Sequence, residues 1–281
     1  MLLTRGRPLR IVIAICALCF GCDHGTSGQP AKQTSVSGKP PVDIAAIKQT
    51  RINPVDGAVM VWIPPGKFTM GGTEYVREKP PHKVNLTGYW IYKYPVTVKQ
   101  FRKFCNATSY KFEWNILVPG WGWKDDHPIV NVSWDDAHAY CLWSGTELPS
   151  EAQWEKAARG PKQFRFAWGN SWDSSKLCCM RSRDEGTCAV YRGSHISQSG
   201  YGCMDMSGNV RQWCQDNYDE TGYHYSVVND PIYLDSSNTH AIRNGSWTEI
   251  NSTYFRCSER TGWPTNVTSS TVGFRCSVNS R

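Results

Sequence analysis

The amino-acid sequence predicts an α+β domain with short strands, few helices and many loops. Apolar stretches with strand-like alternation come first, and segments with the 3.6-residue spacing of a helix follow them. The chain contains 24 Gly and 16 Pro together with 13 Trp and 13 Tyr, which is typical of a loop-rich fold packed largely through aromatic side chains. No internal repeat is found, and we expect the part beyond the N-terminal region to bury one large core.

The N-terminal residues have the pattern of a secretory signal. Three arginines precede the apolar stretch 11–20, which has the length of a signal h-region and is too short to span a bilayer. Gly21-Cys22 follows and resembles the processing site of a bacterial lipoprotein, although Cys19 stands where that signal usually has Leu. We expect residues 1–22 to be a signal peptide and Cys22 to be lipidated. The protein would then be exported and membrane-anchored, facing the periplasm or the cell surface, and plain secretion is the alternative.

The next segment, 23–57, is rich in Gly, Ser, Pro, Gln and Lys and has few large apolar residues. Such a composition predicts a flexible linker. We therefore place the domain at residues 58–281.

Local signals within the domain predict three strands and three helices. Val, Ile and aromatic residues between Gly and Pro indicate strands, and Thr97, Ser133 and Ser150 are expected to cap helices, with Gly160 ending the third one. From Phe164 onward, turns and short strands are expected. The predicted strands are 59–63, 67–70 and 82–86, and the predicted helices are 97–105, 133–144 and 150–159.

The formal net charge is +7, but three of these charges belong to the arginines before the apolar stretch. No block of Lys and Arg occurs elsewhere. The sequence therefore argues against a nucleic-acid partner.

Several blocks of the domain resemble the formylglycine-generating enzyme (sulfatase-modifying factor) family in order and spacing. They are MVWIPPGKFTMGG, EKPPHKVNLTGYWIYKYPVTVKQFRKFC, HPIVNVSWDDAHAYCLWSGTELPSEAQWEKAARG, FAWGN, YGCMDMSGNVRQW, NGSW and VGFRC. The resemblance implies a C-type-lectin-like α+β fold with two main helices, small twisted antiparallel sheets and abundant loops.

The resemblance also implies an active site, which this sequence lacks in large part. Family members convert a substrate cysteine to formylglycine with O2 and a copper(I) ion held by two thiolates, ligands that suit soft Cu(I). These cysteines are expected shortly after the NGSW block, but residues 248–255 contain none, and Glu249 stands about where the first would be. Arg211 replaces a tryptophan of the family's GNVWEW. Copper is therefore not expected; the remaining catalytic candidates are Ser246, Arg211 and Glu249, and whether the protein is an enzyme stays open.

A second metal site implied by the resemblance is a structural calcium loop. Asp205 and Gln212 would supply side-chain oxygens, and Gly208 and Val210 would supply carbonyl oxygens, in line with calcium's all-oxygen preference. Gln212 replaces the usual Glu and removes one negative charge. A bound calcium ion and a loop held by its own hydrogen bonds are both open.

Nine cysteines follow Cys22, and an odd number leaves at least one unpaired within the chain. The resemblance implies a Cys141–Cys276 disulfide, and it places the partner of Cys257 near Ala158, which is not a cysteine. Cys257 is therefore the leading candidate for the odd thiol, unless Cys203 or Cys214 pairs with it. Arg256 and Arg260 flank Cys257 and would lower its pKa if they faced it, but a disulfide or a small buried residue is the simpler interpretation. A local closure of a loop is expected among Cys178, Cys179 and Cys188.

The segment after the NGSW block combines aromatic and small polar residues, which is the composition of a binding surface. We expect it to bind a protein, peptide or glycan ligand, as variable proteins of diversity-generating retroelements do with the same fold; an ordinary solvated loop region is the alternative. A different class of function, an oxidative maturation enzyme of the periplasm without the copper pair, is retained as the second hypothesis. The predicted contact residues are Trp247, Thr248, Glu249, Asn251, Thr253, Tyr254, Trp263 and Asn266.

Overall fold

The computed structural model describes residues 49–190, 197–223 and 227–280. The predicted signal peptide, Cys22 and most of the predicted linker lie outside these residues. No helix in the described part of the chain is long and apolar enough to cross a membrane.

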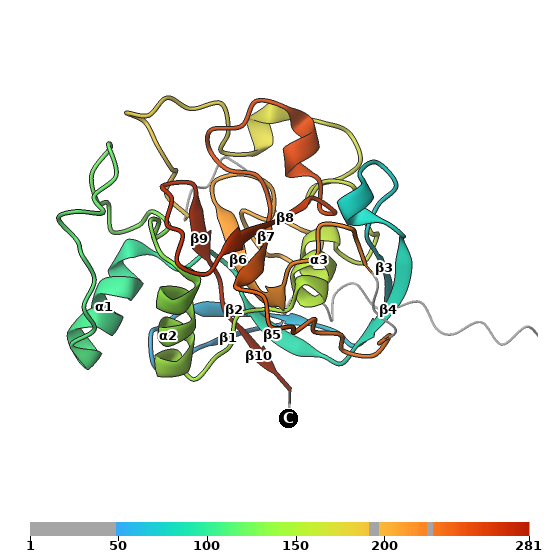
Figure 1. The fold of residues 1–281 in the computed structure, drawn as a ribbon, viewed down its shortest axis with the longest axis horizontal. Helices are drawn as coiled ribbons and strands as arrows, with labels where there is room; N and C mark the ends of the chain where they lie inside the picture. Colours follow the sequence, from blue (N-terminus) through green and yellow to red (C-terminus); the bar gives the residue numbers. More distant parts are fainter. Residues whose placement is uncertain (1–48, 191–196, 224–226, 281) are drawn as a thin grey trace, which may run out of the picture. The chain divides into compact units, whose positions relative to one another are not determined.

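The described residues form three small sheets, whose strands are labelled in Figure 1. In the first sheet all neighbours are antiparallel, and the C-terminal strand lies beside a strand from the N-terminal third. The third sheet is mixed, because its edge strand β9 runs parallel to β6. In spatial order the sheets are β1(Thr50–Ile52)-β2(Val59–Ile63)-β5(Tyr89–Tyr92)-β10(Ser277–Asn279), then β3(Gly66–Met70)-β4(His82–Leu86), then β8(Arg260–Pro264)-β7(Thr239–Arg243)-β6(Arg211–Asn217)-β9(Val272–Phe274).

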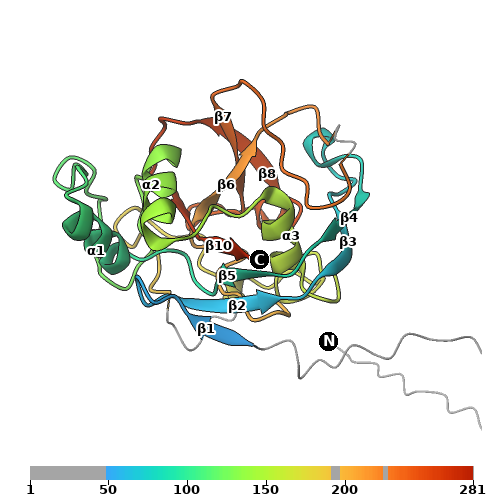
Figure 2. The same cartoon turned by 90° about the horizontal axis from the view of Figure 1, so that it is seen from below.

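The described residues contain three α-helices: α1(Val98–Thr108), α2(Trp134–Ser144) and α3(Glu151–Arg159). Figures 1 and 2 show α1 beside α2, whereas α3 packs against strands of the second and third sheets. The α+β class is confirmed, but the resemblance implied two main helices and the structure has three.

Each helix begins where the sequence predicts. Thr97, Ser133 and Ser150 all form capping boxes, in which the cap hydroxyl accepts the N–H of the third helical residue and the side chain of that residue accepts the backbone N–H of the cap residue. Gly160 ends α3 with a positive φ of 66°. The two residues of each capping box are only three positions apart, so the helix starts can be predicted from the sequence.

The predicted domain start at Ala58 is wrong. Residues 50–52 form β1, which pairs with β2, and Asn53 and Asp56 are buried. The Asp56 carboxylate accepts hydrogen bonds from the hydroxyls of Tyr92 (2.8 Å) and Tyr140 (2.5 Å). The end of the predicted linker therefore belongs to the domain, because polar residues there have partners far along the chain.

Aromatic packing dominates one side of the core, as the composition predicts. Phe101 of α1 stacks with Tyr140 of α2 at 5.9 Å between ring centroids and meets Phe274 of β9 edge-on. Cys141 and Cys276 lie within this cluster with their Sγ atoms 3.5 Å apart, in contact but not bonded. Their disulfide stays a prediction.

Candidate functional site

The C-terminal segment that carries the predicted site is the loop 244–259, between β7 and β8. Arg243 at the end of β7 and Arg260 at the start of β8 are paired in the sheet, and both side chains are fully buried. Glu151 of α3 accepts hydrogen bonds from Arg243 Nη1 (3.1 Å) and from Arg260 Nε and Nη2 (3.0 and 2.6 Å). One buried carboxylate thus holds both ends of the loop.

A second ion-pair cluster holds the C-terminal part of the loop. Arg256 donates to both carboxylate oxygens of Glu78 (2.7 and 2.6 Å), and Arg77 donates to both oxygens of Glu259 (2.9 and 3.1 Å). The Arg256–Glu78 pair is bidentate, with two nitrogens donating to two oxygens, and such a pair restricts geometry as well as adding energy. Residues 256–260 are therefore framework and do not line a site.

Cys257 is a buried residue and not a candidate nucleophile. The guanidinium groups of its neighbours Arg256 and Arg260 are engaged with carboxylates, and burial raises the pKa of the Cys257 thiol to about 12. A thiol of this kind stays protonated at neutral pH and is a poor nucleophile or metal ligand. The simpler interpretation, a small buried side chain, is confirmed.

The three catalytic candidates, Ser246, Arg211 and Glu249, do lie together. Arg211 donates from Nε (3.1 Å) and Nη2 (2.7 Å) to one oxygen of Glu249, and the backbone N–H (2.6 Å) and hydroxyl of Ser246 donate to the other. Burial raises the pKa of Glu249, but the charge of Arg211 and the hydrogen bonds from Ser246 outweigh it and hold that pKa below its ordinary value. The Glu249 carboxylate therefore stays ionised, and both of its oxygens accept hydrogen bonds from Arg211 and Ser246. These three residues together fix the shape of the loop.

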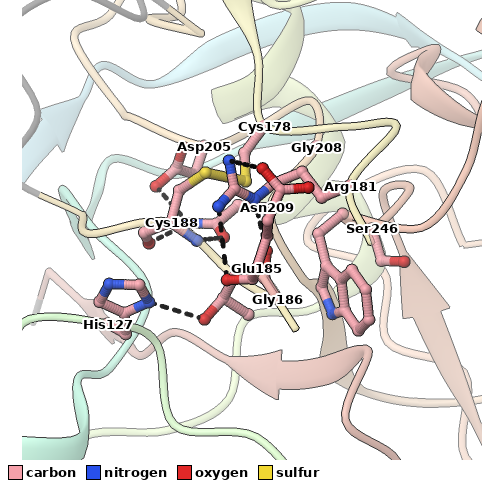
Figure 3. Close-up of a disulfide and its surroundings, with 12 residues drawn as sticks. His127, Cys178, Arg181, Glu185, Gly186, Cys188, Asp205, Gly208, Asn209 and Ser246 are labelled. Carbon is pink, nitrogen blue, oxygen red and sulfur yellow. Dashed lines mark hydrogen bonds and ion pairs between the residues drawn. A yellow bond between two sulfur atoms is a disulfide. The ribbon is translucent and has the colours of Figure 1, made fainter. Parts of the chain in front are cut away.

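The disulfide Cys178–Cys188 closes the loop between these two cysteines (Figure 3). A local closure among Cys178, Cys179 and Cys188 was predicted from the sequence. Backbone hydrogen bonds join this loop to the C-terminal segment: Met180 N–H donates to Glu249 O (3.2 Å) and Arg181 N–H to Trp247 O (2.9 Å). Cys179 is left as a half-buried thiol beside Glu249, and burial, then the charge of Glu249, raise its pKa. No local pattern distinguishes this thiol from Cys178 and Cys188, because its proximity to Glu249 depends on a contact across 70 residues.

The predicted contact residues separate into three groups in the structure. Trp247 is only 2% exposed, meets Trp121 edge-on at 5.0 Å and donates from Nε1 to Ser270 O. It is therefore core, and its assignment as a contact residue is wrong. Trp263 and Asn266 lie at or beyond the far end of β8, away from the residues that follow Trp247.

Glu249, also predicted as a contact residue, is held by Arg211 and Ser246 with its side chain 14% exposed, so that assignment is wrong as well. The other predicted residues do form one surface. Thr248, Asn251 and Tyr254 are exposed, Thr253 is partly exposed, and Asn251 caps the short 3-10 helix η4(Ser252–Phe255). Two aliphatic side chains that the sequence analysis missed, Ile250 and Met180, extend it. We call the exposed residues Met180, Thr248, Ile250, Asn251 and Tyr254 the C-terminal face.

Apolar exposure on this face is large for single side chains. Ile250 is 72% exposed, Met180 53% and Tyr254 38%. The Arg211 guanidinium lies 5.7 Å from the centroid of the Tyr254 ring, so the ion pair beneath also supports the aromatic side chain above. Exposed apolar groups on a rigid support are the features of a contact surface.

The four predicted calcium ligands also lie together, but the atoms that face one another do not fit a cation. The carbonyl oxygens of Asp205, Gly208 and Val210 accept hydrogen bonds from Asn244 Nδ2, and Gln212 turns its Nε2 toward Asp205 O. Calcium takes oxygen ligands at about 2.3–2.6 Å. Here the carbonyl oxygens accept hydrogen bonds from nitrogen donors, which stand where the ion would bind. No group of three or more His, Cys, Asp or Glu side chains able to hold a metal occurs among the described residues.

Comparison with known proteins identifies the protein family. Residues 46–280 match the family model of the sulfatase-modifying factor enzyme 1-like domain, and the chain belongs to this family. It is 28% identical to the formylglycine-generating enzyme of Mus musculus over 78% of this chain and 75% of that protein. It is 32% identical to the serine/threonine-protein kinase Pkn1 of Chlamydia trachomatis serovar L2 over 77% of this chain, but spans only 38% of that kinase.

Solved structures confirm the fold. PvdO from Pseudomonas aeruginosa superposes with a TM-score of 0.71 at 23% identity, over 83% of this chain and 98% of PvdO. Treponema denticola variable protein 1 superposes with a TM-score of 0.66 at 21% identity, over 83% of this chain and 99% of that one. The C-type-lectin-like, formylglycine-generating-enzyme-like architecture expected from the sequence is therefore shown.

Proposed function

We propose that this protein is an exported, lipid-anchored binding protein whose C-terminal face contacts a polypeptide partner. The observation that carries the proposal is the internal use of Glu249. At the position where the family resemblance places a copper thiolate, this chain has a carboxylate whose oxygens face Arg211 and Ser246. Around this closed ion pair, the side chains that remain accessible are suited to contact.

The chemistry of the face favours a polypeptide over a glycan. Ile250 and Met180 are aliphatic and largely exposed. Burying such side chains against another apolar surface removes them from water and favours binding. Tyr254 supplies rigid aromatic area with a polar end, and Thr248 and Asn251 supply adaptable hydrogen bonds. Attachment through Cys22 would place this face outside the cytoplasm, in accord with the signal pattern of residues 1–22.

A second part of the proposal concerns sequence variation. Treponema denticola variable protein 1 shares this fold, and we propose that the exposed positions of the C-terminal face differ between copies of the gene while the ion-pair framework does not. Sequencing alleles, together with a search for a template repeat and a reverse-transcriptase gene nearby, tests this part separately.

The enzyme hypothesis has one observation in its favour, the half-buried Cys179 thiol beside Glu249. A single thiol does not supply the two-thiolate copper site that the resemblance implies. Oxygen consumption with a cysteine peptide as substrate is the result that this alternative predicts.

The binding proposal is tested with the full-length protein in detergent against a displayed library of random peptides and against a glycan array. Peptides selected by the wild type should lose at least 10-fold in affinity for Ile250→Ser. Leu142→Ser is the matched control, because Leu142 is exposed to a similar extent but lies on α2, and its affinity should be unchanged. Equal losses for both variants, or glycan binding without peptide binding, would contradict the proposal.

A further inference from the structure

The loop 205–212 directs three carbonyl oxygens toward one point, and a side-chain nitrogen occupies that point. Asn244 Nδ2 lies 3.1 Å from Asp205 O, 2.8 Å from Gly208 O and 3.0 Å from Val210 O. Convergent carbonyls of this kind are what a bound cation normally requires. Here an amide, which carries no net charge, takes the central place.

The orientation of the Asn244 amide is fixed by its other end. Its Oδ1 accepts the backbone N–H groups of Gly208 and Gly245, both at 2.8 Å. Reversing the amide would set its NH2 against two N–H donors and its oxygen against three carbonyl oxygens. The nitrogen must therefore face the carbonyls.

The same argument fixes Gln212. Its Oε1 accepts hydrogen bonds from Trp154 Nε1 (2.9 Å) and Arg275 Nε (2.6 Å), so its Nε2 faces Asp205 O (3.0 Å) and Val210 O (3.4 Å). The position that would supply an acidic calcium ligand thus supplies a hydrogen-bond donor instead.

A fully buried guanidinium supplies positive charge beside the loop. Arg275 is fully buried and donates from Nη2 to Met204 O (2.6 Å) and to Asp205 O (3.4 Å). The Asp205 carboxylate accepts from Asn209 Nδ2 (3.2 Å), next to the Cys178–Cys188 disulfide (Figure 3). Backbone oxygens that a divalent cation would neutralise are therefore satisfied by donors of the chain itself.

We propose that the nitrogen donors of Asn244, Gln212 and Arg275 replace the calcium ion of this loop, so that the domain folds and keeps its stability without calcium. A calcium ion would need the place of Asn244 Nδ2 and would meet a second nitrogen at Gln212. The proposal does not depend on the proposed binding function, since it concerns only the framework behind the C-terminal face.

Two substitutions should restore calcium binding. Asn244 has φ +80°, a conformation that glycine adopts without strain, so Asn244→Gly removes the amide and keeps the backbone. Gln212→Glu then places a carboxylate oxygen against two carbonyl oxygens, Asp205 O and Val210 O, and a bound cation would relieve their repulsion. The double variant should therefore bind calcium that the wild type does not.

The experiment measures thermal unfolding of the full chain in EGTA and in excess CaCl2, together with calcium titration calorimetry. For the wild type, Tm should differ by less than about 1 °C between the two conditions and no heat of binding should appear, whereas the double variant should gain roughly 5 °C in CaCl2. Asn131→Gly with Gln215→Glu is the matched control; Asn131 has φ +57° and donates to Leu117 O instead, and Gln215 lies on the same strand as Gln212. This control should show no response to calcium.

Stoichiometric calcium binding by the wild type, with a Tm that falls in EGTA, would overturn the proposal. If the double variant folds but gains no calcium response, the assignment of the exclusion to these two amides is wrong. If the double variant does not fold, the wild-type titration alone decides.

Discussion

Replacing Glu151 with glutamine tests the inference that one buried carboxylate holds both ends of the loop 244–259. Glu151 is fully buried between Arg243 and Arg260, and their charges and hydrogen bonds outweigh burial and hold its pKa below the ordinary value. Glutamine keeps the shape but removes the charge. Arg243 would then retain Glu155 as an ionic partner, and Arg260 would retain the carbonyls of Arg77 and Asp219.

Removing one partner of a buried ion pair costs about 3–5 kcal/mol, because the remaining charge stays in a poorly solvating interior. Against a total stability of about 5–15 kcal/mol, urea unfolding followed by tryptophan fluorescence should show this loss clearly. Hydrogen exchange should also become faster in residues 244–259, since both ends of the loop lose their common anchor. Glu147→Gln is the control: Glu147 is exposed, and its substitution should cost no more than about 0.5 kcal/mol. A loss below about 1 kcal/mol for Glu151→Gln, or unchanged exchange in the loop, would refute the reasoning.

Three further predictions follow from the buried groups. Burial and the charge of Glu151 raise the pKa of the Asp216 carboxyl to about 7, well above its unfolded value of about 3.9. The contribution of this group to stability should therefore be highest below pH 4 and should fall by up to about 4 kcal/mol as the pH rises to 7. Asp216→Asn should flatten that part of the pH–stability curve, and an unchanged slope would contradict the prediction. Iodoacetamide should modify Cys179 in the native protein and Cys257 only after unfolding, as peptide mass spectrometry would show, whereas early modification of Cys257 would contradict its burial. Glu249→Ala should cost about 2 kcal/mol of stability, because Arg211 and Ser246 both lose a charged acceptor; a neutral effect in urea unfolding would show that the ion pair does not hold the loop.

The sequence predicted those elements whose signals are local. The helix caps at Thr97, Ser133 and Ser150 each depend on a residue three positions away, and all three are observed. The strand β1 was missed because all three of its residues are exposed and it is defined only by pairing with β2. No periodicity marks a strand of this kind.

The candidate site was predicted in outline but not in its chemistry. The family blocks in the sequence pointed to Ser246, Arg211 and Glu249 and showed that the two thiolates are missing. The Arg211–Glu249 ion pair, which engages the carboxylate, forms only when β6 and the loop after β7 lie side by side in the fold. Trp247 was assigned to the surface because aromatic residues among small polar ones resemble a contact surface, whereas its partner Trp121 lies 126 positions earlier in the chain. Met180 joined the face through backbone hydrogen bonds that no local pattern encodes.

We propose that the C-terminal segment carries a contact surface in place of the family's oxidative site. Oxygen uptake by the full-length protein, loaded with stoichiometric copper(I) and supplied with a cysteine-containing peptide, tests it most directly, with a formylglycine-generating enzyme as the positive control. We expect no uptake above the rate of free copper and no formylglycine by mass spectrometry of the peptide. Copper-dependent uptake with formylglycine formation, abolished by Cys179→Ser, would contradict the account.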